Sequence, residues 1–223
     1  MDLGSISEIL LNLINEMTVM VTVIAILVSS LNNFKELVVE RKFTYKNQII
    51  MMIIFGAFSI FGSYSGTKLD SGAIANLRDT GPLIAGLIGG PIVGLGAGLI
   101  GGIARYFGGG FTALPCSIAT ISAGIIGGLV YTYNNREFLG PQKAIIIAVL
   151  VEIYHMGLTL ILAKPYSEAL EVVKIVALPM ILSNAMAVAI FSVIIGSLIQ
   201  DKMKIKELED NLAIISSNEE EKI

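Results

Sequence analysis

Two arginines in this chain have neighbours that suit the binding of a small anion. Arg78 follows Asn76, and Arg105 precedes three consecutive glycines at 108–110. A guanidinium group presents planar, paired N–H donors that match a carboxylate or a phosphate. Glycines let backbone N–H groups approach an anion, and nearby hydroxyl and thiol groups add donors. The predicted anion site consists of Asn76, Arg78, Arg105, Gly109, Gly110, Thr112, Cys116 and Ser117.

Each arginine also has a simpler interpretation. Arg105 by itself is compatible with a side chain that snorkels to lipid phosphates at the membrane surface. Arg78 is followed by Asp79, which offers a local ion pair. The sequence leaves both alternatives open beside the anion site.

A second polar group lies within an apolar segment. Glu152 and His155 are one helical turn apart and share a helix face. Ionisable groups at that depth are costly unless they are paired or face a cavity. They either sense a ligand or a proton at the floor of a cavity, or form an interhelical hydrogen bond with Asn184 or Ser183. Glu152, His155 and Asn184 are therefore a possible buried polar site.

The sequence predicts neither a catalytic centre nor a metal site. Cys116 and His155 lie on segments that we expect at different membrane depths, which argues against a thiolate–imidazole pair. With one histidine and one cysteine, multi-histidine and thiolate metal sites are excluded. We expect no metal, no cofactor and no enzymatic activity in this chain.

The elements that position these residues are membrane-spanning helices. Hydrophobic residues make up 54% of the chain, charged residues only 15%, and the mean hydropathy is +0.79, whereas soluble domains contain about 25% charged residues. Apolar runs at 9–31, 48–64, 144–163 and 175–199 approach or reach the length of a spanning helix. We predict an all-α membrane protein, a polytopic helical bundle in contact with lipid, with no nucleic-acid partner. The first run lacks a cleavage site and is read as a retained helix.

Residues 82–107 allow two topologies. They form either one helix, or two short elements broken at Gly89-Gly90-Pro91, because proline interrupts a helix. Short cytoplasmic segments are enriched in lysine and arginine. The break gives seven membrane elements, with ten basic residues on the inner side and five on the outer side. The unbroken helix places eight basic residues inside and seven outside. We favour the break, which places Arg78, Arg105 and Cys116 together at the outer mouth. The ten inner residues are Lys35, Arg41, Lys42, Lys46, Arg136, Lys143, Lys202, Lys204, Lys206 and Lys222.

Patterns at two further places predict how the helices pack and end. Glycine recurs every fourth residue from Gly86 to Gly102, which favours close helix packing in lipid. From Gln200 onward, apolar residues recur at helical spacing among charges, typical of a helix leaving the membrane, although a solvated extension stays possible. We expect an N-terminal transmembrane helix (1–33), a sensor domain (34–199), a cytoplasmic signalling helix or linker (200–223), and a two-fold homodimer.

Asn76-Leu77-Arg78, Gly89-Gly90-Pro91, Arg105-Tyr106 and Pro115-Cys116 resemble the five-transmembrane receptor domain of LytS-type sensor kinases, over roughly residues 30–200. The resemblance implies a prokaryotic cell-membrane sensor with a cytoplasmic C-terminus joined to a histidine kinase or cyclase output in a two-component or similar system. It also implies an extracellular pyruvate-like carboxylate, bound by the arginines and the cysteine of these motifs. The family's serine three positions after that cysteine is Ala119 here.

This family is also similar in fold to the substrate-binding subunits of energy-coupling-factor transporters. That likeness implies one N-terminal helix followed by a six-helix bundle with a ligand pocket near the outer face. Our leading hypothesis is a sensor domain that binds a small anion such as pyruvate and signals to a cytoplasmic output module. The alternatives are a transporter subunit, and an anchor and dimerisation device without a ligand.

Overall fold

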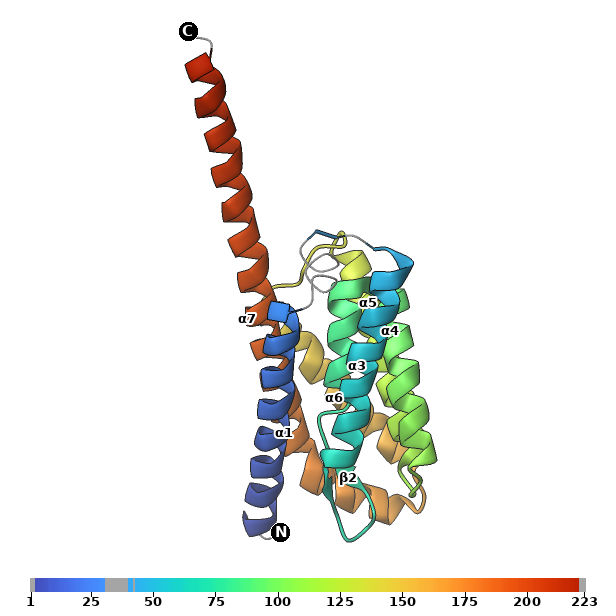
Figure 1. The fold of residues 1–223 in the computed structure, drawn as a ribbon. Coiled ribbons are helices and arrows are strands. Elements are labelled where there is room, and N and C mark those ends of the chain that lie inside the picture. Colours follow the sequence, from blue (N-terminus) through green and yellow to red (C-terminus); the bar gives the residue numbers. More distant parts are fainter. Residues whose placement is uncertain (1–2, 31–39, 42, 221–223) are drawn as a thin grey trace.

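The computed structural model describes residues 3–30, 40–41 and 43–220, which form a bundle of long helices (Figure 1). Within these residues, six helices are long and apolar enough to cross a membrane. The predicted all-α fold is confirmed, with one short antiparallel hairpin added. The elements are α1 (Leu3–Ser30), α3 (Tyr45–Ser65), β1 (Thr67–Lys68), β2 (Ile74–Ala75), α4 (Thr80–Phe107), α5 (Ala113–Tyr133), α6 (Pro141–Leu162) and α7 (Tyr166–Glu220).

The outer surface of the bundle is apolar, while charged side chains lie inside. This arrangement is the reverse of a soluble protein and is expected when lipid is the solvent, because ionisable groups then face the bundle interior. Buried charged residues include Arg78, Arg105 and Glu152. Large side chains that face outward include Ile53, Ile103, Ile153, Leu178 and Val193.

Helix α4 is a helical hairpin and not one straight span. Gly90 has φ 81° and ψ −173°, outside the helical region, immediately before Pro91. A Cβ atom on Gly94 would lie 2.7 Å from the Cα atom of Gly86, whereas eight residues of continuous helix advance about 12 Å. The chain therefore turns back at Gly90, and residues 80–89 lie against 91–107. The predicted break is confirmed, and it brings Arg78 and Arg105 to the same end.

Glycines allow α4 its largest interface, which is with α5. A Cβ atom on Gly94 would lie 2.2 Å from the carbonyl oxygen of Gly124, and one on Gly86 would lie 2.5 Å from the same oxygen. Since neither backbone atom can move independently of its helix, only glycine permits this approach. The predicted close packing is confirmed, and it presses both halves of α4 onto one face of α5.

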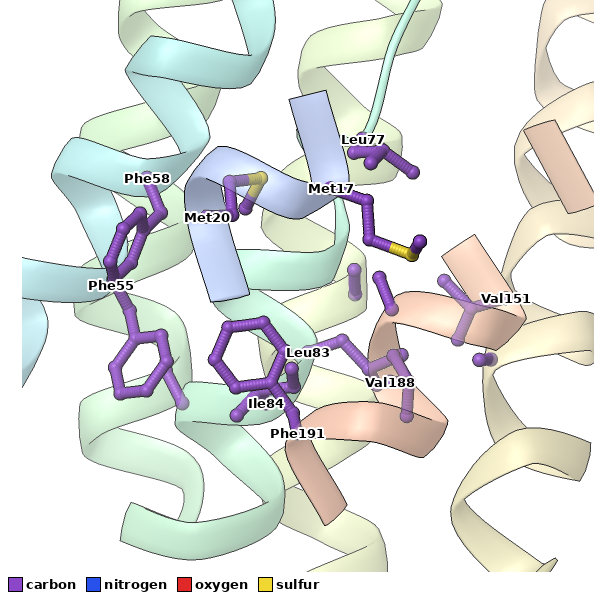
Figure 2. Packing of buried hydrophobic residues seen from close by; sticks show 14 of the residues in the cluster. Met17, Met20, Phe55, Phe58, Leu77, Leu83, Ile84, Val151, Val188 and Phe191 are labelled. Atoms are coloured by element: carbon purple, nitrogen blue, oxygen red, sulfur yellow. The ribbon is translucent and has the colours of Figure 1, made fainter. Parts of the chain in front are cut away.

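The apolar core joins α1 to the rest of the bundle. Met17 and Met20 of α1 lie in one cluster with Leu83 and Ile84 from the first half of α4, together with side chains of α3 and α7 (Figure 2). Helix α1 packs along α7. Near this core, Oε1 of the buried Glu16 accepts a hydrogen bond from the backbone N–H of Leu77 at 3.2 Å. Helix α1 is therefore tied to the loop that precedes α4.

Helix α7 begins before the apolar run that predicted it at 175–199. It starts at Tyr166 and carries the exposed Glu168, Glu171 and Lys174 on helical backbone. Polar residues show where the chain meets water, but they do not end a helix. Helix α7 can therefore begin in the polar segment. At its other end, α7 passes residue 200 without interruption and projects beyond the bundle (Figure 1). The predicted helix after residue 200 is confirmed, while its exit from the membrane and the domain boundaries stay predictions.

The two ends of the bundle differ in charge. We call the end from which α7 emerges the tail end. Arg41 and Arg136 line one hollow there, and Lys202 forms an ion pair with Glu40. The opposite end, here the hairpin end, carries β1 and β2. A hollow there is lined by Glu8, Asp70, Glu168 and Glu171 and by one basic residue, Lys68. This asymmetry matches the predicted orientation, in which the tail end is cytoplasmic. Lys35, Lys42, Lys222 and the boundary at residue 33 lie outside the described residues.

Candidate functional site

A tight turn between β2 and α4 directs Arg78 into the bundle. The side-chain oxygen of Asn76 accepts a hydrogen bond from the Arg78 N–H at 3.2 Å, a short-range bond typical of asparagine in turns. The amide of Asn184, on α7, donates to the Asn76 carbonyl at 3.4 Å. Asn76 therefore shapes the loop and is itself held by α7. As a result, the Arg78 side chain is 0% exposed.

The guanidinium group of Arg78 is only partly satisfied by the protein. Its Nε donates to the Thr120 hydroxyl at 2.7 Å and lies 3.5 Å from Oδ1 of Asp79. Neither Nη1 nor Nη2 has a hydrogen-bond acceptor among the residues that the structure describes. Local pairing with Asp79, the simpler interpretation, accounts for one nitrogen of three. The two outer nitrogens are the paired donors that a carboxylate would need.

Arg105 is also buried, which rules out snorkelling. Its Nη1 donates to the Gly109 carbonyl at 2.6 Å, and its Nη2 donates to the Thr112 hydroxyl at 3.0 Å. Gly109 and Gly110 adopt positive φ values of 70° and 86°, which turn the loop over this guanidinium. The Gly109 N–H donates to the Tyr106 carbonyl instead of facing a ligand. The predicted anion contact of that N–H is therefore wrong, because the loop uses it to end α4.

Cys116 lies between the two arginines and next to the histidine. Its sulfur interacts with the guanidinium groups of both Arg78 and Arg105. Nε2 of His155 is 3.3 Å from the same sulfur. The prediction that Cys116 and His155 lie at different depths is wrong. Helices α5 and α6 are antiparallel, so the start of one lies beside the second half of the other.

Asp79 connects this group to the polar residues of α6. Its Oδ2 is 2.9 Å from His155 Nδ1, which is also 3.5 Å from Oε2 of Glu152. Its Oδ1 accepts a hydrogen bond from the Thr120 hydroxyl at 2.6 Å. Burial opposes the charged form of the Asp79 carboxyl, whereas the nearby Arg78 guanidinium and the Thr120 hydroxyl favour it.

Two predicted residues have other partners than expected. Asn184 was expected to meet Glu152 or His155, yet its Oδ1 accepts from the Thr80 hydroxyl at 2.6 Å. The interhelical partner of His155 is Asp79, which precedes Thr80. The Ser117 hydroxyl donates to the Ala113 carbonyl in its own helix at 2.7 Å. Both side chains support the backbone around the site.

Asp79, Glu152 and His155 also form a set of possible metal ligands, with ligand atoms within 4.8 Å of one another. Carboxylate and imidazole groups do bind divalent cations. Here, however, Nε of Arg78 is 3.5 Å from the Asp79 carboxylate, and a second guanidinium lies beyond Cys116. These positive charges would repel a metal ion. The buried cluster suits an anion better than a cation.

A small cavity adjoins the cluster at Cys116 and His155. Its volume is about 20 Å³, which is room for about one water molecule. The remaining wall is mostly apolar and comes largely from α6 and α7. That wall includes Met156, Val172, Val173, Val176 and Met180.

Three contributors were not among the predicted site residues, and one of them is Asp79, which the sequence offered only as a local ion-pair partner of Arg78. Glu16 is the one acidic residue in the apolar run at 9–31, a signal that marks functional residues in membranes. Thr120 carries no comparable signal, because threonines are ordinary in helices. Its hydroxyl is nevertheless the shared partner of Arg78 and Asp79.

A multi-span helical bundle that seals a cluster of arginine, cysteine and histidine side chains away from lipid defines a membrane protein with an internal polar site. The family model described as 5TMR of 5TMR-LYT matches residues 31–198, and the chain belongs to this family of membrane sensor domains. Such domains lie in the plasma membrane of prokaryotes.

Named relatives are sensor proteins. The chain is 37% identical to Sensor histidine kinase BtsS of Escherichia coli (strain K12) over 150 residues, covering 65% of this chain and 27% of that protein. It is 34% identical to Sensor protein LytS of Bacillus subtilis (strain 168) over 182 residues, covering 74% and 31%. It is 29% identical to Sensor protein LytS of Staphylococcus epidermidis (strain RP62A) over 217 residues, covering 90% and 36%. The chain thus spans about a third or less of these relatives' length. No solved structure matches it.

Proposed function

We propose that this chain is a receptor domain that binds a small pyruvate-like carboxylate at its hairpin end and signals to a cytoplasmic output module. One observation carries the proposal. Nη1 and Nη2 of Arg78 are buried, and no described residue accepts a hydrogen bond from them. Buried polar groups without partners are rare in folded proteins and point to an ion or solvent partner. A carboxylate would accept from both nitrogens at once.

The surroundings of Arg78 limit the size and the charge of the ligand. Nε of Arg105 likewise has no acceptor in the described part of the chain, so a second positive donor faces the same region. The adjoining cavity is small and its wall is mostly apolar. These features favour a compact, singly charged anion with a short alkyl group. They do not favour a long-chain or multiply charged ligand.

The contacts of the Arg78 loop provide a route for signalling. The backbone N–H of Leu77, beside Arg78, donates a hydrogen bond to Glu16 of α1. The backbone carbonyl of Asn76 accepts one from the side chain of Asn184 on α7. A ligand that displaces this loop would shift both helices, and α7 leads out of the bundle. Such signalling requires that the ligand bind one helix arrangement more tightly than the other.

The family and its relatives favour the sensor over the transporter-subunit alternative, since the relatives are named as sensor proteins. The ligand-free anchor remains the alternative that an experiment must exclude. It predicts no saturable small-molecule binding.

The test is a thermal-shift titration of the purified chain in detergent with pyruvate, lactate and acetate. Binding stabilises the folded state by about 2.7 kcal/mol when the ligand reaches 100 times its Kd. We expect a saturable rise in melting temperature with a short carboxylate, and loss of that rise in Arg105→Ala. The control is Lys174→Ala, which removes an exposed positive charge near the start of α7. It should respond like the wild type.

Two results would contradict the proposal. If no short carboxylate shifts the melting temperature, the chain is not a carboxylate receptor. If Arg105→Ala and Arg78→Ala keep the full shift, the ligand binds elsewhere.

A further inference from the structure

Cys116, His155 and Asp79 are connected like a nucleophile, its base and an orienting carboxylate. The sulfur is 3.3 Å from Nε2 of His155, and Nδ1 of the same ring is 2.9 Å from Oδ2 of Asp79. All three side chains are buried. A carboxylate at Nδ1 keeps the proton on that nitrogen and leaves Nε2 to accept the thiol proton. A cysteine paired in this way is an activated nucleophile.

The unsatisfied arginine nitrogens lie next to this sulfur. Cys116 interacts with the guanidinium of Arg78, whose Nη1 and Nη2 have no acceptor within the described residues. A carboxylate held by these nitrogens would therefore lie against the sulfur. The carbon adjacent to that carboxylate is the ligand atom that the thiol reaches first.

The cavity that Cys116 lines suits a short alkyl group. Cys116 and His155 contribute to its lining, together with the apolar Val172, Val176 and Met180. A ligand with a carboxylate toward the arginines and a methyl group toward these apolar side chains would place its second carbon at Cys116.

We propose that Cys116 recognises 2-oxo carboxylates by reversible covalent addition to the ketone carbon. This inference rests on the carboxylate-receptor function proposed above and names its ligand class. His155 takes the thiol proton at Nε2, and the sulfur attacks the ketone carbon. A sulfur–carbon bond forms, the carbon–oxygen π bond breaks, and the oxygen takes the proton from His155. The product is a thiohemiketal, and the same steps in reverse release the ligand. Nothing is oxidised or reduced.

This chemistry separates ligands that are similar in size and charge. A 2-hydroxy acid and an unsubstituted carboxylic acid offer the same carboxylate to the arginines but no electrophilic carbon to the sulfur. The site would therefore hold pyruvate more tightly than lactate, although the two acids are similar in size. Arginine contacts alone would not discriminate between them.

The experiment is carbon-13 NMR of pyruvate labelled at the ketone carbon, bound to the purified full chain in detergent. We expect a protein-dependent signal moved from the ketone region to that of a tetrahedral carbon bonded to oxygen and sulfur. Cys116→Ser keeps a hydrogen-bonding group of similar size but a much weaker nucleophile, and it should lose this signal. Lys174→Ala should keep it. Free pyruvate hydrate also has a tetrahedral carbon, but its signal would be unchanged in Cys116→Ser.

Thermal-shift titrations with pyruvate and lactate complete the test. In the wild type, pyruvate should bind at least tenfold more tightly than lactate, and in Cys116→Ser this ratio should fall toward one. The unliganded melting temperature of Cys116→Ser checks that the variant is folded, and Cys116→Ala provides a second variant. Saturable pyruvate binding with an unmoved ketone signal would overturn the covalent step and leave the carboxylate receptor standing. No saturable binding of pyruvate would overturn the covalent step, and no saturable binding of any short carboxylate would overturn both.

Discussion

At the scale of single residues, the site is organised by hydrogen bonds that satisfy one arginine nitrogen and one carboxylate oxygen through a shared hydroxyl. Thr120 accepts from Nε of Arg78 and donates to Oδ1 of Asp79. This hydroxyl holds the two opposite charges in a fixed geometry. It leaves the outer nitrogens of Arg78 free of oxygen acceptors from the described residues. The protein thus supplies a hydrogen-bond partner for Nε of Arg78 and leaves Nη1 and Nη2 to donate to a ligand.

Replacing Thr120 by valine tests this arrangement. The variant keeps the shape of the side chain but leaves Arg78 Nε and Asp79 Oδ1 without their shared partner. Loss of a buried partner costs about 1–3 kcal/mol, and more for charged groups. We expect the free energy of unfolding, measured by SDS titration in mixed micelles, to fall by at least that amount. Ligand affinity should fall with it.

The matched control is Thr132→Val on the same helix. The Thr132 hydroxyl donates only to the Gly128 carbonyl one turn earlier, near the other end of α5. Its loss should change the free energy of unfolding by less than about 0.5 kcal/mol. Equal effects of the two variants would show that Thr120 has no special role.

At the scale of elements, the reversal of α4 at Gly90 is what makes the site. It returns the chain to the hairpin end, so that Arg105 meets the residues that precede the same helix. Both halves of α4 pack on α5. Helix α5 in turn carries Cys116 and Thr120 into the space between the two arginines. The glycines of this interface therefore determine how close the functional groups come.

Gly94→Ala tests the interface directly. The added Cβ would lie 2.2 Å from the Gly124 carbonyl oxygen, which belongs to the backbone and cannot turn aside. Overpacking of this kind costs about 1–3 kcal/mol and sometimes more. We expect a lower melting temperature and weaker carboxylate binding, since α4 must move away from α5.

Gly157→Ala is the matched control for that substitution. A Cβ at Gly157 of α6 meets no described atom within 4 Å. Alanine in a helix is favoured over glycine by about 0.5–1 kcal/mol. This variant should therefore melt at the same temperature or slightly higher. A similar loss in both variants would mean that helix geometry, and not the α4–α5 contact, explains the effect.

At the scale of the whole molecule, the bundle has a basic tail end and an acidic hairpin end. Basic segments are retained on the cytoplasmic side of a membrane. The internal site lies nearer the hairpin end, and α7 extends from the tail end (Figure 1). A ligand from outside and an output module inside are consistent with this polarity. The orientation is therefore central to the sensor hypothesis.

Cysteine labelling in intact cells tests the orientation. Asp70→Cys places an exposed thiol at the hairpin end, and Lys206→Cys places one on the projecting part of α7. A membrane-impermeant maleimide should label the first variant in intact cells and the second only after permeabilisation. The buried Cys116 should stay unlabelled in both and serves as an internal control. The opposite labelling pattern would invert the topology and place the site on the cytoplasmic side.

Local composition was sufficient for the class of protein and for much of its outline. Apolar runs predicted the spans, because a lipid environment demands about 20 apolar residues for each. Gly90 and Pro91 predicted the break in α4, since both act on their own backbone. Arg78 and Arg105 were identified as a pair because the break returns the chain to one end. These features depend on residues close together in sequence.

The partners inside the site depended instead on how distant helices face one another. Cys116 and His155 are 39 positions apart, and whether they meet depends on the rotation and the depth of α5 against α6. The meeting of Asp79 with His155 depends on the same two quantities for α4 and α6. A shift of one residue turns a helical side chain by about 100°, enough to face it away from its partner. Periodicity does not specify such rotations, because they follow from the packing of all helices together.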